Sequence, residues 1–310
     1  MNKLTKENFN KAKDYIFTEG RALEREMFKF HFEKGSSRSV LNELARYQNC
    51  DGGFGNALEP DLRTPLSSAL ATSIALREMV KIGISDQNDI LKNTVSYLLI
   101  SLDQDKWRWI IAPIGRENSP HAPWWGAEDV VGAFRGCIAN PTAEITGYLL
   151  NYKDLIPKGI IESLLGRLES YLDEATSSTS NFEMHDLMCY LALYHSKGLK
   201  DSTSEKFKPI LVSQAKRIVD TEKEKWIEYG ARPLWFCDSP NSMLYPHFEK
   251  SIQINLDFEI ESQNENGSWS PFWSWEDYNS KDWPIAQKDW SSHLTLRNLF
   301  LFKNYGRLEE

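Results

Sequence analysis

Cysteine is scarce in this chain, with four among 310 residues, and no two of them stand in C-x-x-C spacing. This spacing argues against a disulfide framework and against a zinc site built on cysteine. We therefore expect reduced thiols with structural roles. The four are Cys50, Cys137, Cys189 and Cys237.

Long apolar runs are also missing. The longest, at residues 97–100 (YLLI), is far too short to cross a bilayer, so we expect no membrane span. Residues 1–7 (MNKLTKE) have neither the apolar core nor the small-residue cleavage site of a secretory signal. The simplest expectation is a cytoplasmic protein.

Clustered basic residues are the third absence. The formal net charge is −8, and Lys and Arg are not gathered in any segment. Nucleic-acid binding needs clustered cations against the phosphates, so we predict no nucleic-acid partner. The 41% hydrophobic and 26% charged content is typical of a globular chain with a sizeable core. We expect a single domain over residues 1–310.

Helical periodicity fills most of the chain. Between residues 9 and 32, apolar side chains recur at spacings of three and four, as one buried helix face requires. No segment sustains the alternation of a strand, so the predicted fold class is all-α. Similar patterns predict helices at residues 40–47, 66–80, 90–102, 143–155, 160–172, 182–195, 210–219, 248–260 and 294–302.

Capping residues mark several helix starts. Thr64 and Asn140 each precede a proline, which predicts an N-cap followed by proline in the first turn. Asn181 and Asp289 are further cap candidates. Because each predicted start follows a loop and each loop follows a helix, we expect a series of helix hairpins.

One loop sequence recurs along the chain. Residues 48–54 (QNCDGGF) return as residues 263–269 (QNENGSW), with weaker echoes at residues 104–109 (QDKWRW) and 222–226 (EKEKW). Such recurrence indicates stacked repeats that bury their faces against one another. We expect Gln to close the preceding helix, Gly to make the turn, and the aromatic residue to pack beneath the next hairpin.

The repeated loops and the helix-hairpin rhythm resemble the squalene cyclase, terpenoid cyclase and protein prenyltransferase superfamily. The resemblance implies an α/α toroid, a ring of about five to six helix hairpins around a central pocket. It also implies that residues 1–35 form an N-terminal helix packing on the ring. Complement thioester domains and a family of pectate lyases share this toroid, so the fold alone does not decide the reaction.

The catalytic motifs of that superfamily are missing here. Class II terpene cyclases use a D-x-D-D stretch, and the nearest segment is Glu59-Pro60-Asp61. The Asp-x-Cys of the prenyltransferase zinc site and the Cys-Gly-Glu-Gln thioester motif do not occur. The resemblance therefore implies a fold and a pocket, and we assign no cofactor and no metal.

In a toroid, the inner helices begin after the repeated loops, and their N-termini meet around one mouth that favours anions. Residues near these starts, and tryptophans in long loops, are the candidate site residues. The catalytic candidates are Glu59, Asp61, Glu144, Asp289 and His293. The ligand-binding candidates are Arg63, Trp124, Trp125, Glu183, His185, Asp186, Asp238 and Trp273.

Each catalytic candidate has a structural alternative. Glu59, Asp61 and Glu144 either offset a helix dipole or act as acids of raised pKa. Asp289 and His293, four residues apart, are either an acid-base pair or a helix cap and a packing residue.

All eleven tryptophans lie after residue 105. Trp269 belongs to the repeated loop, so we expect it to pack between hairpins. Trp124, Trp125 and Trp273 stand in long loops and are better placed to line a pocket. An aromatic wall suits a carbocation, a prenyl chain or a sugar ring.

Three functions remain open at this point. The first is a small-molecule enzyme or binder that handles isoprenoids in an acidic, aromatic-lined central pocket, with Glu59 or Asp61 as proton donor. The second is a carbohydrate-active lyase or hydrolase in which Glu144, Glu183, or Asp289 with His293, transfers protons. The third is a non-enzymatic interaction module that uses the rim of the ring.

Overall fold

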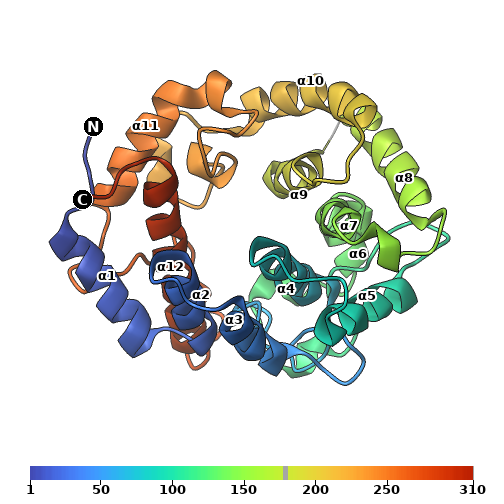
Figure 1. Cartoon of the computed structure of the whole chain (residues 1–310), viewed down its shortest axis with the longest axis horizontal. Coiled ribbons are helices and arrows are strands. Elements are labelled where there is room, and N and C mark those ends of the chain that lie inside the picture. The colour runs from blue at the N-terminus through green and yellow to red at the C-terminus, as the bar shows by residue number, and fades with distance from the viewer. Residues whose placement is uncertain (177–180, 310) are drawn as a thin grey trace. The chain divides into compact units, whose positions relative to one another are not determined.

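The computed structural model describes residues 1–176 and 181–309, and this part of the chain is all-helical (Figure 1). It contains α-helices, short 3-10 helices and isolated β-bridges, without a β-strand in the described ranges. The predicted fold class, all-α, is confirmed. None of the described helices is both long enough and apolar enough to span a bilayer.

The chain forms two compact units. One comprises residues 44–217, and the other comprises residues 1–43 together with residues 218–310. The ring of helix hairpins over the whole chain, with a single domain of residues 1–310, stays a prediction.

The unit of residues 44–217 is built on three inner helices that pack side by side (Figure 1). These are α4 (Ala69–Lys81), α7 (Thr142–Leu150) and α9 (Met184–Tyr194). An added Cβ on Gly147 would lie 2.6 Å from the Cα of Leu193, so glycine allows α7 and α9 to approach closely. The short helix α6 (Val130–Ala133) precedes α7.

Each inner helix has an outer partner. The helix α5 (Asp89–Ser101) packs on α4, and α8 (Ile160–Glu174) packs on α7. The helix α10 (Asp201–Ile218) meets α9 through the rings of Phe207 and Tyr190, whose centroids are 6.0 Å apart. The predicted rhythm of helix hairpins is therefore present in this unit.

The second unit holds α1 (Lys6–Glu19), α2 (Ala22–Phe32), α11 (Tyr245–Glu261) and α12 (Trp283–Asn304), and the chain leaves it through α3 (Ser37–Leu44). The helices α1 and α2 both pack on α12. The region predicted as one N-terminal helix is therefore two helices. The break falls at Gly20, where an added Cβ would lie 2.6 Å from Ser292 Oγ of α12, so a larger residue could not sit there.

The first repeated loop is fixed by its glutamine and glycine. Gln48 Nε2 donates to the carbonyl oxygens of Gly52 (3.0 Å) and of Ile90 in α5 (3.1 Å). Gly52 has φ of +88°, and an added Cβ would lie 2.3 Å from the Asn93 carbonyl oxygen. The glutamine therefore joins the loop to a later helix, not to the end of the preceding helix as expected.

The second repeated loop has the same construction. Gln263 Nε2 donates to the carbonyl oxygens of Gly267 (2.8 Å) and of Asn8 in α1 (3.0 Å). Gly267 has φ of +89°, and an added Cβ would lie 2.3 Å from the Lys11 carbonyl carbon. The helix α1 therefore makes the same contacts with this loop as α5 makes with the first repeated loop.

The aromatic residue that ends each of these loops is buried, and its backbone is hydrogen-bonded to α4, α7 or α12. The backbone N–H donates to a threonine Oγ1 at 3.0 Å in three loops. The echo at residues 104–109 is thus a true repeat, and Trp269 packs as predicted. The pairs are Phe54 with Thr72 of α4, Trp109 with Thr142 of α7, and Trp269 with Thr295 of α12. The faint echo at 222–226 differs, because Trp226 lies in a 3-10 helix.

Four predicted helix caps are wrong. Asn140 is not the cap of α7, because this helix begins at Thr142 with Pro141 in the cap position. The helix α4 begins at Ala69 with Ser68 as its cap, because the Ser68 N–H pairs with the Phe54 carbonyl oxygen and holds residues before it out of the helix. The helix α9 is capped by Glu183 instead of Asn181. Asp289 lies inside α12, which begins eleven residues earlier than the predicted segment at 294–302.

Gly52→Ala tests the loop contact. We expect a loss of about 1–2 kcal/mol for the left-handed backbone and at least about 1 kcal/mol more for the clash with Asn93. Gly83→Ala is the matched control, because Gly83 also has positive φ (+68°) but nothing within 4 Å of an added Cβ. Denaturant midpoints measure both variants. Equal losses would mean that the close approach at Gly52 contributes nothing.

Candidate ligand sites

Glu59 and Asp61 lie in a tight turn that packs against a later loop of the same unit. The Ala122 N–H donates to the Asp61 carbonyl oxygen (2.8 Å), and the Arg63 N–H donates to the carbonyl oxygen of residue 120 (3.0 Å). Both carboxylates are buried, with 8% and 3% of their residue surface exposed. In this pairing, buried His121 lies opposite Leu62 in an antiparallel β-bridge. His121 was not among the residues predicted from the sequence.

Trp124 and Trp125 follow that pairing and differ in role. The Trp125 ring is buried and stacks on Phe134, with centroids 4.9 Å apart and an interplanar angle of 8°. Buried Arg116 donates from Nε to the Trp125 carbonyl oxygen at 2.6 Å, which fixes the backbone. Trp124 keeps 40% of its surface exposed. Trp125 is thus packed within the loop, and Trp124 is the ring available at the surface.

Glu144 lies half-buried on α7, where its carboxylate accepts two hydroxyl groups. Ser73 of α4 donates to Oε1 at 2.6 Å, and Tyr148 donates to Oε2 at 3.5 Å. Burial, with a further contribution from the Glu144 charge, raises the pKa of Tyr148 well above its ordinary value. This arrangement holds Glu144 as a hydrogen-bond acceptor between two inner helices.

Glu183, His185 and Asp186 gather at the start of α9. Glu183 and Asp186 form a capping box, and both carboxylates pair with Arg135. Burial opposes ionisation of Glu183, yet the hydrogen bond from His185 and the Arg135 charge hold its pKa below the ordinary value. Burial raises the pKa of Asp186 to about 6 despite Arg135. The three predicted residues are therefore brought together, with Arg135 as a partner that the sequence did not reveal.

Asp186→Asn tests this raised pKa. The folded state favours protonated Asp186, so the corresponding stability is fully present below pH 3.8 and is lost as pH rises through about 6. The loss is of order 3 kcal/mol. We expect denaturant midpoints of the variant to vary less between pH 4 and 7 than those of Asp154→Asn, an exposed control. Parallel pH profiles for the two variants would contradict the assignment.

In the unit of residues 1–43 and 218–310, three aromatic rings surround the ring of Trp273. We call Tyr229, Trp235, Trp273 and Trp290 the aromatic cluster. From Trp273 the ring centroids lie at 5.0 Å for Trp290, 5.4 Å for Tyr229 and 6.4 Å for Trp235, all edge to face. Tyr229 is exposed and the three indoles are half-buried, so ring surface remains accessible.

Polar groups of α12 border the aromatic cluster. His293 packs on Trp290 with ring centroids 5.8 Å apart, and the Arg297 guanidinium lies 5.2 Å from the Trp235 ring. Arg297 Nη2 also donates to the Leu234 carbonyl oxygen at 2.7 Å. The enclosed Nε1 of Trp290 has no hydrogen-bond partner among the described residues.

Of the predicted site residues, Trp273 and His293 thus lie close together, because both pack on the ring of Trp290. Asp289 lies one helical turn before His293 in the middle of α12, so it is not a cap. Asp238 is exposed and lies outside the aromatic cluster, and its backbone carbonyl oxygen accepts a hydrogen bond from Asn304 Nδ2 at 3.0 Å. Tyr229 and Trp235 were missed, because nothing in the local pattern links their segment to α12.

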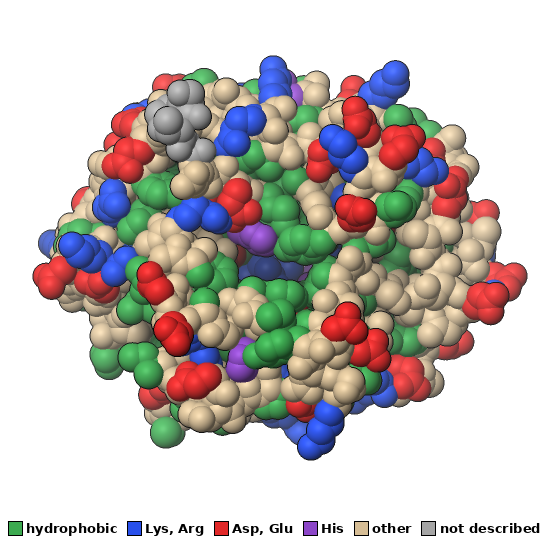
Figure 2. Space-filling model, turned by 180° about the vertical axis from the view of Figure 1, so that it is seen from behind, with side chains coloured by type: hydrophobic (Ala, Val, Ile, Leu, Met, Phe, Trp, Pro, Cys, Tyr) green, Lys and Arg blue, Asp and Glu red, His purple; other side chains and the backbone are tan. Residues whose placement is uncertain are grey.

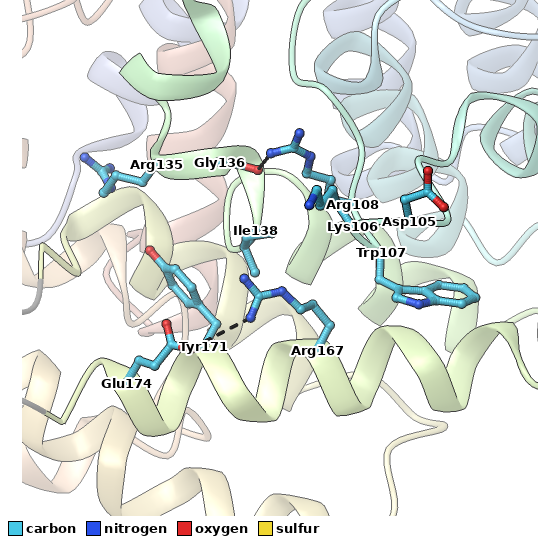
Figure 3. A pocket seen from close by; sticks show the side chains of 10 residues that line it. All are labelled: Asp105, Lys106, Trp107, Arg108, Arg135, Gly136, Ile138, Arg167, Tyr171 and Glu174. Atoms are coloured by element: carbon cyan, nitrogen blue, oxygen red, sulfur yellow. Dashed lines mark hydrogen bonds and ion pairs between the residues drawn. The ribbon is translucent and has the colours of Figure 1, made fainter.

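Two cavities lie within single units. The larger, about 510 Å³, belongs to residues 44–217 (Figure 3). The smaller, about 370 Å³, is lined by hydroxyl and amide groups of the second repeated loop and by α1 and α12. None of the predicted site residues lines either cavity. The larger one is lined by Asp105, Lys106, Trp107, Arg108, Arg135, Gly136, Ile138, Arg167, Tyr171 and Glu174.

Charge and thiol chemistry add little to these sites. Figure 2 shows one face, on which the acidic and basic side chains are interspersed instead of gathered by sign. Burial raises the pKa of the Cys137, Cys189 and Cys237 thiols, whereas Cys50 is exposed. Within residues 1–176 and 181–309, no three His, Cys, Asp or Glu side chains are grouped so that they could hold a metal ion.

Comparison with known proteins identifies no relative of this chain. No protein-family model matches the chain, and neither the curated proteins nor the solved structures give a significant match. The resemblance to the terpenoid cyclase superfamily therefore rests on the repeated loops and stays a prediction.

Proposed function

We propose that the protein binds a short oligosaccharide with an acidic sugar on the aromatic cluster, as a carbohydrate-active lyase or hydrolase. The observation that carries this proposal is the group of accessible rings around Trp273, bordered by His293 and Arg297. Sugar rings have apolar faces that stack on indoles and polar edges that need hydrogen bonds. A guanidinium beside the rings suits a carboxylate.

The polar border favours a sugar over an isoprenoid. A prenyl chain needs only apolar contact, whereas the imidazole of His293 and the guanidinium of Arg297 beside the rings match the hydroxyl and carboxylate groups of an acidic sugar. A cationic ligand or carbocation is disfavoured, because Arg297 already lies against Trp235. The buried positions of Glu59 and Asp61 give the isoprenoid reaction no accessible proton donor in their turn.

His293 is the proposed proton-transfer group. Its ordinary pKa lies near neutrality, and it stands half-buried beside the rings on which the sugar would stack. Asp289 lies one turn before His293 on the same helix, α12. Proton abstraction next to a uronate carboxylate is the step such a pair can perform.

We also propose that the repeats close into a toroid. The support lies in the equivalent contacts of the two loops, because Gln263 binds α1 as Gln48 binds α5. On this proposal the first helix of the chain completes the last hairpin, with α12 as the inner helix and α1 as the outer one.

Trp273→Ala tests the ligand site. Tryptophan fluorescence of the intact protein is followed during titration with galacturonate oligomers, neutral oligosaccharides and farnesyl diphosphate. Loss of a central indole should cost about 2 kcal/mol, or roughly thirtyfold in Kd for the acidic sugars. Trp124→Ala, an exposed indole outside the aromatic cluster, should bind as the unchanged protein does. Binding of the prenyl ligand alone, or of none of the three, would refute the sugar proposal.

His293→Gln tests the chemistry. Once a cleaved sugar is known, we expect kcat to fall by about 10²–10⁴ with little change in Kd, because a general acid-base residue acts on the reacting proton. His247→Gln, at an exposed position of α11, is the control. Unchanged kcat in His293→Gln would leave the aromatic cluster as a binding surface without proton transfer by His293.

A further inference from the structure

The larger cavity is a separate feature of residues 44–217. Its walls come from the loop at residues 105–108, the turn at residues 135–138 and one face of α8 (Figure 3). Its volume of about 510 Å³ falls in the range of small-ligand sites. In Figure 3, Tyr171 and Arg167 rise from α8 toward the turn at Gly136, and Arg108 reaches the same turn from the facing loop.

Unusual backbone conformations hold both loops. Arg135, Gly136 and Cys137 have φ of +50°, +76° and +57°, and Trp107 on the facing loop has φ of +51°. Left-handed residues other than glycine cost free energy and tend to occur where a binding site needs them. Arg108 Nη1 donates to the Gly136 carbonyl oxygen at 2.9 Å, which ties the two loops together.

The cavity lining contains four cationic side chains, and they differ in how far acidic partners neutralise their charge. They are Lys106, Arg108, Arg135 and Arg167. Arg135 pairs with Glu183 and Asp186, and Arg108 pairs with Asp103 at 3.2 Å. The ammonium of Lys106 has no hydrogen bond or ion pair with a described residue, and within the same residues the guanidinium of Arg167 forms an ion pair with Glu174.

The contact between Arg167 and Glu174 is weak. The two groups lie 3.9 Å apart, and 69% of the Glu174 side chain is exposed to solvent. Such a pair contributes little. Two cations are therefore available to a ligand.

We propose that this cavity binds a small molecule through an oxyanion, either carboxylate or phosphate, held between Lys106 and Arg167. Arg167 offers a planar fork that matches both oxyanions, and Lys106 supplies a mobile point charge. Asp105 and Glu174 also line the cavity, so the excess positive charge is small. This suits a ligand with one or two negative charges better than a long polyanion.

Calorimetric titration of the full chain with inorganic phosphate, pyrophosphate and citrate at low ionic strength tests the proposal. We expect heat of binding with at least one probe, weakened by added salt as screening requires. Arg167→Ala and Lys106→Ala should each raise Kd at least tenfold. Arg167→Lys should lie between Arg167→Ala and the unchanged protein, because it keeps the charge and loses the fork. Lys153→Ala, an exposed lysine of the same unit, should change nothing.

Two results would overturn this anion site. One is an absence of binding heat with all three probes, and the other is an equal Kd for Arg167→Ala and Lys153→Ala. Arg167 is partly exposed, so both variants should fold, which circular dichroism checks. Trp273→Ala should bind the anion as the unchanged protein does. The outcome is therefore separate from that of the sugar proposal.

Discussion

The hydrogen bond from the backbone N–H of a buried loop aromatic residue to a threonine of α4, α7 or α12 anchors the repeated loops of this protein. Phe54, Trp109 and Trp269 each make it at the same distance of 3.0 Å. The bond satisfies a buried backbone donor that would otherwise lack a partner at considerable cost. It also fixes where the chain leaves the loop, because the buried ring cannot shift without breaking the bond. The segment that follows each ring therefore starts at a fixed position beside α4, α7 or α12.

The sequence predicts this framework well but not its boundaries. Spacing of three and four identifies the amphipathic helices, and the repeated letters identify the loops. The early start of α12 at Trp283 was missed, because the helix buries residues on several sides and so lacks a clear periodicity. The proline after Thr64 suggests a helix start, yet pairing of Ser68 with Phe54 delays it. Tertiary hydrogen bonds overrode a local capping preference in that case.

The proximity of candidate site residues could be predicted from the sequence only where those residues lie on the same helix. His293 shares α12 with Trp290 and Arg297, so their common face follows from helical spacing. Tyr229 and Trp235 come from a distant segment, and only the fold brings their rings to Trp273. The left-handed backbone at Trp107 and Arg135 could not be foreseen, because neither residue type favours that conformation. Burial of Glu59 and Asp61 was equally invisible in their local sequence.

The positions of the candidate ligand sites follow from which parts of each repeat make structural contacts. In the loops at residues 48–54 and 263–269, the glutamine, glycine and aromatic positions are occupied by structural contacts, so they are not available for ligands. The chain between the buried aromatic residue and the helix to which it bonds differs in length among the three repeats, over residues 55–68, 110–141 and 270–282. Trp273 lies in one such insertion and Arg135 in another. Insertions that leave a repeat from a fixed point can place new side chains without disturbing the packed helices.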